Sequence, residues 1–188
     1  MDTPQLGRSQ WQRWVELPDR WPMVKWSMVG ISGLVLALVL ISPWYGVYVR
    51  DDESLPQYSF FLLKKGVTPQ RGDLVAFEMA QEYADRVRPA GFQRPYARVG
   101  KLWLKEAYGV AGDRVRVDGR TIVVGDRPVA TVIERDVLKQ PVEPAEFETP
   151  VVPPGHYYLG LPHPRSFDSR VIGYVSMKDI RGVVWPIY

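Results

Sequence analysis

The chain of 188 residues contains no cysteine and only two histidines, His156 and His163. So few nitrogen and sulfur ligands argue against a zinc site, and we expect neither a metal nor another cofactor. Both histidines stand beside Pro or Gly, in positions more typical of turns and strand ends than of a Ser-His-Asp triad. A domain of about 140 residues can bury enough core without disulfides, so the missing cysteines leave the cellular compartment open.

An excess of charge of one sign is also missing. The net charge is +3, from 24 Lys and Arg against 21 Asp and Glu, and the two signs are mixed along the chain. This balance argues against nucleic acid as a partner. The basic residues of the leader, 1–25, suit contact with anionic lipid headgroups.

Charged residues are absent between Lys25 and Arg50. As a helix, the 24 residues of 26–49 would reach roughly 36 Å, enough to cross a hydrocarbon core of about 30 Å. We therefore predict one transmembrane helix over 26–49. Aromatic residues typical of membrane interfaces stand at its ends: Trp26, Trp44, Tyr45 and Tyr48.

Two other interpretations of this segment are disfavoured. A cleaved secretory signal would end in small residues, whereas this run ends in bulky ones and follows a long leader. A buried core helix would have a polar face, whereas this segment is apolar all round.

The orientation follows from the basic residues near the helix ends. Four of them precede the span, whereas only Arg50 follows it before Lys64. The positive-inside rule then places the leader in the cytoplasm and exports 50–188 across the inner membrane, into the periplasm of a Gram-negative bacterium. The four preceding residues are Arg8, Arg13, Arg20 and Lys25.

The region 50–188 has the pattern of a mostly β domain. Two β-branched runs within 115–124 are joined by Asp118-Gly119, a strong hairpin signal, and Gly125-Asp126 predicts a second turn. Further strands are predicted over 73–77, 129–133, 156–160 and 171–175. The Pro-rich and charged stretches 80–98 and 139–154 are predicted to be loops or insertions.

Ser54 and Lys105 are the candidate catalytic residues. A serine before Leu-Pro usually begins a turn, and a lysine on a strand is usually solvated, so neither position is informative alone. A serine nucleophile needs a base, and with histidine disfavoured the candidate is lysine. Trp103 and Leu104 would help to exclude water from Lys105, which favours the neutral amine.

Four motifs, in order after the apolar segment, resemble the conserved boxes of the serine signal peptidases. They are 54–56 (SLP), 71–77 (RGDLVAF), Lys105 with 109–113 (GVAGD), and 166–170 (SFDSR). The compact size and the run 163–170 (HPRSFDSR) resemble the TraF-type conjugative-transfer peptidases most. The resemblance implies a signal-peptidase-like β domain with a Ser-Lys dyad, tethered by one N-terminal transmembrane helix.

The resemblance also implies residue roles. Ser54 would be the nucleophile, and Lys105 the general base. Ser166 would hydrogen-bond the lysine nitrogen and orient it, while Asp168 and Arg170 would form a structural ion pair beneath the site.

Two positions depart from the family pattern. Asp52 stands where a hydroxyl often helps to bind the oxyanion, and its charge would repel one, so the Ser54 backbone N–H would need another donor. Glu106 stands where a basic residue is common, but alternation along a strand would point it away from Lys105.

The sequence thus predicts a membrane-anchored serine endopeptidase of exported precursors, with a pilin or another conjugative-transfer component as substrate. Some members of the family instead pass the acyl group to an amine of the same chain and cyclise the pilin. A catalytically silent scaffold of the transfer apparatus also remains open. A self-cleaving repressor fits poorly, because this chain carries an apolar helix where a DNA-binding head would stand.

Overall fold

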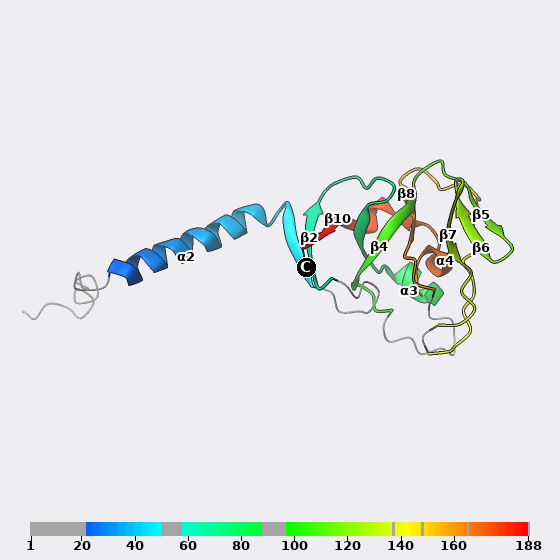
Figure 1. Ribbon diagram of the computed structural model, residues 1–188, viewed down its shortest axis with the longest axis horizontal. Coiled ribbons are helices and arrows are strands. Elements are labelled where there is room, and N and C mark those ends of the chain that lie inside the picture. Colours follow the sequence, from blue (N-terminus) through cyan, green and yellow to red (C-terminus); the bar gives the residue numbers. More distant parts are fainter. Residues whose placement is uncertain are drawn as a thin grey trace, which may run out of the picture. The chain divides into compact units, whose positions relative to one another are not determined.

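The structure is a computed structural model that describes residues 22–49, 58–87, 97–136, 138–147, 149–164 and 166–187. The chain divides into two compact units, Met1–Pro43 and Trp44–Tyr188. The first contains helix α2, Pro22–Ile41, and the second contains the strands (Figure 1).

Helix α2 is a candidate membrane span. Over Met23–Ile41 it is long and apolar enough to cross a bilayer, and its described side chains are exposed along its whole length, as those of a buried core helix would not be. The helix is shorter than the predicted 26–49. It ends before Ser42-Pro43, because proline disfavours a helical conformation in the residue before it and cannot continue the helix.

The segment Tyr45–Val49, predicted as the end of the membrane helix, is instead strand β1. It pairs antiparallel with β2, Phe60–Lys65, with Val49 opposite Phe60. Its β-branched and aromatic residues suit a strand, and β2 supplies backbone partners from beyond the local sequence. The predicted boundary at 49 is therefore corrected to Ile41.

The larger sheet has seven strands in the order β1-β2-β10-β3-β4-β8-β9, and all the pairs are antiparallel. Its remaining strands are β3 (Leu74–Glu78), β4 (Leu102–Gly109), β8 (His156–Gly160), β9 (Val175–Ser176) and β10 (Ile180–Pro186). The central strands β10, β3 and β4 are mostly buried, which places the middle of the sheet in the core.

A second sheet of three strands contains the predicted hairpins. It consists of β5 (Val115–Asp118), β6 (Thr121–Val124) and β7 (Arg127–Thr131). Asp118 pairs with Thr121, so the first loop is Gly119-Arg120, one residue beyond the predicted turn. Gly119 has φ 60°, a conformation that glycine adopts without steric cost.

Two sequence predictions about local structure were incomplete or wrong. The predicted loop 80–98 contains helix α3, Gln81–Val87, which is too short to show a helical period. The predicted strand 171–175 begins inside helix α4, Ser169–Ile172, and only its last residue, Val175, belongs to a strand, β9. Asp168 caps the N-terminus of α4 by accepting from the Arg170 N–H at 3.1 Å. The segments 138–147 and 149–154 lie outside helices and strands, as predicted for 139–154.

The two faces of the large sheet pack into different clusters. Val75, Phe77 and Trp103 belong to the main core together with the side chains of α3 and α4. Ala76 and Leu104, which alternate with them along β3 and β4, pack in a smaller cluster with residues of β2 and β10. Whether a side chain of β4 packs in the main core or in the smaller cluster therefore depends on the face of the strand from which it projects.

Candidate active site

Lys105 lies in the middle of β4 on the face of the main core. Its strand partner is Val75, and its neighbours on the same face of β4 are Trp103 and Ala107. Its exposed fraction is 2%, which rules out the solvated strand lysine that its sequence context alone would suggest. Burial disfavours an ammonium ion and so favours the neutral amine that a general base requires.

Of Trp103 and Leu104, only Trp103 lies on the face of β4 that carries Lys105. The lysine Nζ lies 5.3 Å from the centre of the Trp103 ring. Leu104 points to the opposite face, into the smaller cluster. The prediction that Leu104 helps to exclude water from Lys105 was therefore wrong.

Glu106 alternates with Lys105 and therefore points to the opposite face of β4, as predicted. Burial raises the pKa of its carboxyl, and the charge of Arg127 opposes this rise.

Ser166 lies in the turn that follows β8. Glu106 pairs with Gly160, so an antiparallel register carried one residue further places Leu161 beside Lys105, and the turn 161–168 begins there. The exposed fraction of Ser166 is 5%, and its Oγ has no hydrogen-bond partner among the described residues. The predicted hydrogen bond from Ser166 to the lysine nitrogen is therefore absent from this structure.

Asp168 and Arg170 form the predicted ion pair, and both side chains are buried. The guanidinium binds the carboxylate through two parallel hydrogen bonds, from Nε to Oδ1 at 2.8 Å and from Nη2 to Oδ2 at 2.8 Å. Oδ2 of Asp168 also lies 3.7 Å from where a Cβ of Gly160 would be, on the Glu106 face of the sheet. The pair is thus beneath the face that carries Lys105, where it cannot act as an acid or base on a substrate bound there.

Arg170 also holds the turn that carries Ser166. Its guanidinium donates to the carbonyl oxygens of Ser166 at 2.9 Å, His163 at 3.0 Å and Thr131 at 3.0 Å. The contact to Thr131 ties the small sheet to the turn. Main-chain acceptors such as these leave no mark in a sequence, so sequence reasoning could not have found them.

The two Gly-Asp motifs form similar turns at strand ends. Asp73 accepts from the N–H of Gln70 at 2.8 Å, and Asp113 accepts from the N–H of Val110 at 2.8 Å. In each turn the glycine before the aspartate has φ near 90°. An ion pair between Arg71 and Asp113 links the two turns, so these motif residues stabilise the fold on either side of β4.

Ser54 and Asp52 lie outside the described residues, as does the Ser54 backbone N–H. The described hydrogen bonds connect Ser166, Asp168 and Arg170, and Lys105 lies on β4, next to β8 in the sheet. That these residues form one site with Ser54 as nucleophile remains a prediction. No group of three His, Cys, Asp or Glu side chains placed to hold a metal occurs in the described part of the chain.

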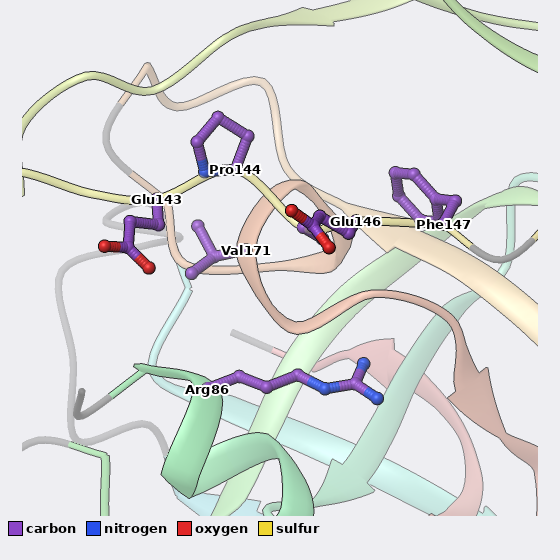
Figure 2. Close-up of a pocket in the computed structure, with 7 residues that line it drawn as sticks. Arg86, Glu143, Pro144, Glu146, Phe147 and Val171 are labelled. Atoms are coloured by element: carbon purple, nitrogen blue, oxygen red, sulfur yellow. The ribbon is translucent and has the colours of Figure 1, made fainter.

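A pocket of about 440 Å³ lies between α3, the segment 143–147 and α4 (Figure 2). Arg86 of α3 reaches along its floor and donates to the carbonyl oxygen of Ile172 at 2.6 Å. Of the described residues predicted for the active site, none lines this pocket, and we assign it no role.

The chain is similar to known proteins in sequence and in fold. The family described as signal peptidase, peptidase S26, matches residues 23–188. The conjugal transfer protein TraF of Agrobacterium fabrum (strain C58 / ATCC 33970) is 30% identical over 171 residues, which cover 85% of this chain and 93% of TraF. A crystal structure of a signal peptidase I from Enterococcus faecalis V583 matches with 23% identity and a TM-score of 0.39, over 62% of this chain and 97% of that one.

Proposed function

Because this chain belongs to the signal peptidase family, peptidase S26, we propose that it is a membrane-anchored serine endopeptidase with Ser54 as nucleophile and Lys105 as general base. The observation that supports this most is the burial of Lys105, at the position that matches the family's lysine motif. Burying an ionisable side chain costs free energy, so a lysine at this buried position is more readily explained by chemistry than by packing.

In the proposed reaction, the Ser54 hydroxyl oxygen attacks the scissile carbonyl carbon while Lys105 Nζ takes the hydroxyl proton. The protonated lysine then gives that proton to the leaving amine, and the peptide C–N bond breaks. Water, whose proton Lys105 takes, then attacks the acyl carbon. The bond from this carbon to the Ser54 oxygen breaks, Lys105 returns the proton to that oxygen, and the new carboxyl terminus is released. Ser166 would orient Nζ in the reacting complex, since its buried Oγ has no hydrogen-bond partner among the described residues.

The similarity to a conjugal transfer protein supports a substrate from conjugative transfer. We propose that this substrate is an exported precursor, a pilin or another component of the transfer apparatus. No cofactor enters the proposed reaction.

The experiment is co-expression of candidate pilin precursors with the wild-type chain, Ser54→Ala and Lys105→Arg. We expect only the wild type to shorten a precursor, because arginine keeps the charge and part of the stem but cannot supply a neutral base near neutral pH. Lys178→Arg is the matched control, since Lys178 is on the surface. Intact masses of the products distinguish hydrolysis from cyclisation by one water, and cleavage by the arginine variant at the wild-type rate would exclude Lys105 as the base.

For the membrane topology, we propose a cytoplasmic N-terminus and a periplasmic catalytic domain, anchored by α2 in the inner membrane. A periplasm-dependent reporter fused after Tyr188 should be active. Activity of a cytoplasm-dependent reporter at the same position, with none from the periplasmic one, would reverse the orientation.

A further inference from the structure

We propose that Trp103 is a positioning residue whose indole face holds the amine of Lys105 and sets the pH at which the site becomes active. This inference rests on the proposed function, in which Lys105 is the general base. In this proposal the tryptophan favours the charged form of Lys105, whereas the surrounding apolar side chains favour the neutral form.

The geometry is that of a cation–π contact. Lys105 Nζ lies over the Trp103 ring, 5.3 Å from its centre, inside the roughly 6 Å range of such contacts. The two residues alternate on one face of β4, so the strand holds their side chains next to each other. Tryptophan is the strongest of the aromatic partners for a cation.

The ring is held by packing and not by a polar bond of its own. Trp103 is 7% exposed and meets Phe77 edge to face, with ring centres 6.2 Å apart. Its Nε1 has no hydrogen-bond partner among the described residues. Replacing the indole with an apolar side chain therefore removes the π face without breaking a hydrogen bond that the structure contains.

The charged and titratable groups around this face lie on several of the described elements. Within the described strands β3 and β4, the face that carries Lys105 holds only Val75, Phe77, Trp103 and Ala107 besides it. Of the charged and titratable groups, Glu106 lies on the opposite face of β4, Glu78 pairs with Arg181, and Asp168 pairs with Arg170. His156 begins β8, and His163 lies in the turn that follows this strand.

Two influences of opposite sign thus meet at one amine. Burial by the core favours the neutral form, whereas the negative face of the indole favours the ammonium. A leucine at 103 would exclude water but would offer no such face. Removing the indole should therefore lower the pKa of Lys105 and start catalysis at a lower pH.

The test is the pH profile of kcat/KM for precursor cleavage by the full chain and by Trp103→Phe and Trp103→Leu. On the acid side of the profile we expect about 2- to 30-fold higher activity for the leucine variant, the range that a cation–π contact supports. The phenylalanine variant should lie between leucine and wild type, and no variant should exceed the wild-type alkaline plateau. Phenylalanine in place of Trp103 leaves a smaller cavity than leucine does. If the leucine variant fails to fold, the pH profile of the phenylalanine variant alone therefore tests the proposal.

Leu104→Val is the matched control, because Leu104 lies on the same strand but faces the other cluster. Its pH profile should follow the wild type. A profile of folded Trp103→Phe that stays at the wild-type pH, or moves to higher pH, would overturn the proposal.

A second measurement does not depend on peptidase activity. The rate at which Lys105 is acetylated by a small reagent, followed by mass spectrometry across pH in the Ser54→Ala background, reports directly on the neutral amine. Its midpoint should fall when Trp103→Phe is added. A wild-type chain that cleaves no precursor would refute the proposed function, whereas an unchanged acetylation midpoint would refute the role of Trp103.

Discussion

Replacement of Arg170 by lysine should destabilise the domain strongly although the charge is kept. The guanidinium makes five side-chain hydrogen bonds, two to Asp168 and one each to the carbonyls of Thr131, His163 and Ser166. A lysine has one nitrogen with three N–H groups, so it can replace at most three of them. At least two acceptors would therefore lose their donor.

Each buried acceptor left without a donor costs about 1–3 kcal/mol, so the free energy of unfolding should fall by about 2–6 kcal/mol. The lower end applies if the acceptors that lose their donor are the part-buried carbonyls of Thr131 and His163. For a domain of this size, such a loss corresponds to a Tm lower by roughly 5 to 20 °C.

The assay is thermal unfolding followed by circular dichroism. Arg120→Lys is the control, because Arg120 also pairs with a carboxylate, Glu134, but both side chains are largely exposed, and its Tm should stay at the wild-type value. A Tm of Arg170→Lys within about 2 °C of wild type would refute the reasoning, since it would mean that the five bonds contribute no more than a surface pair.

Two further predictions concern other buried polar groups. If the proposed orienting role holds, Ser166→Ala should fold normally and lower kcat/KM by very roughly 5- to 150-fold, the effect of one hydrogen bond of about 1–3 kcal/mol, and a fully active variant would remove Ser166 from the site. The Tyr83 hydroxyl donates to Asp179 at 2.8 Å and accepts from the Ser176 N–H at 3.0 Å, and burial raises its pKa above the usual value. Because the folded pKa is the higher one, this stability is present below about pH 10 and is lost as the pH rises above it, so urea titrations should show a smaller alkaline loss of stability for Tyr83→Phe than for wild type.

Much of this protein could be predicted from local sequence patterns. The uncharged run after Lys25, the alternating strand around Lys105 and the turn glycines at 119 and 125 each act over a few residues, so their consequences are visible in the sequence. The strand 156–160 was predicted at its observed limits. Alternation also predicted that Glu106 points away from Lys105, because successive residues of a strand face opposite sides.

Other features depend on contacts between distant segments. Tyr45–Val49 continues the apolar run in the sequence, but β2 draws it into the sheet as β1. The pattern of 171–175 suits a strand, but its first two residues belong to the helix that Asp168 caps, and Asp168 is itself paired with Arg170.

The environment of Lys105 was likewise decided by the tertiary structure. The sequence alone placed Trp103 and Leu104 on equal terms beside the lysine, and only the packing of the two sheet faces separates them. The carbonyls that Arg170 binds come from as far as Thr131, 39 residues away, and a main-chain oxygen carries no side-chain identity that a sequence could reveal. Motif residues could thus be named from the sequence, whereas the groups that bury, pair and orient them follow from the fold, because those contacts join segments far apart in the chain.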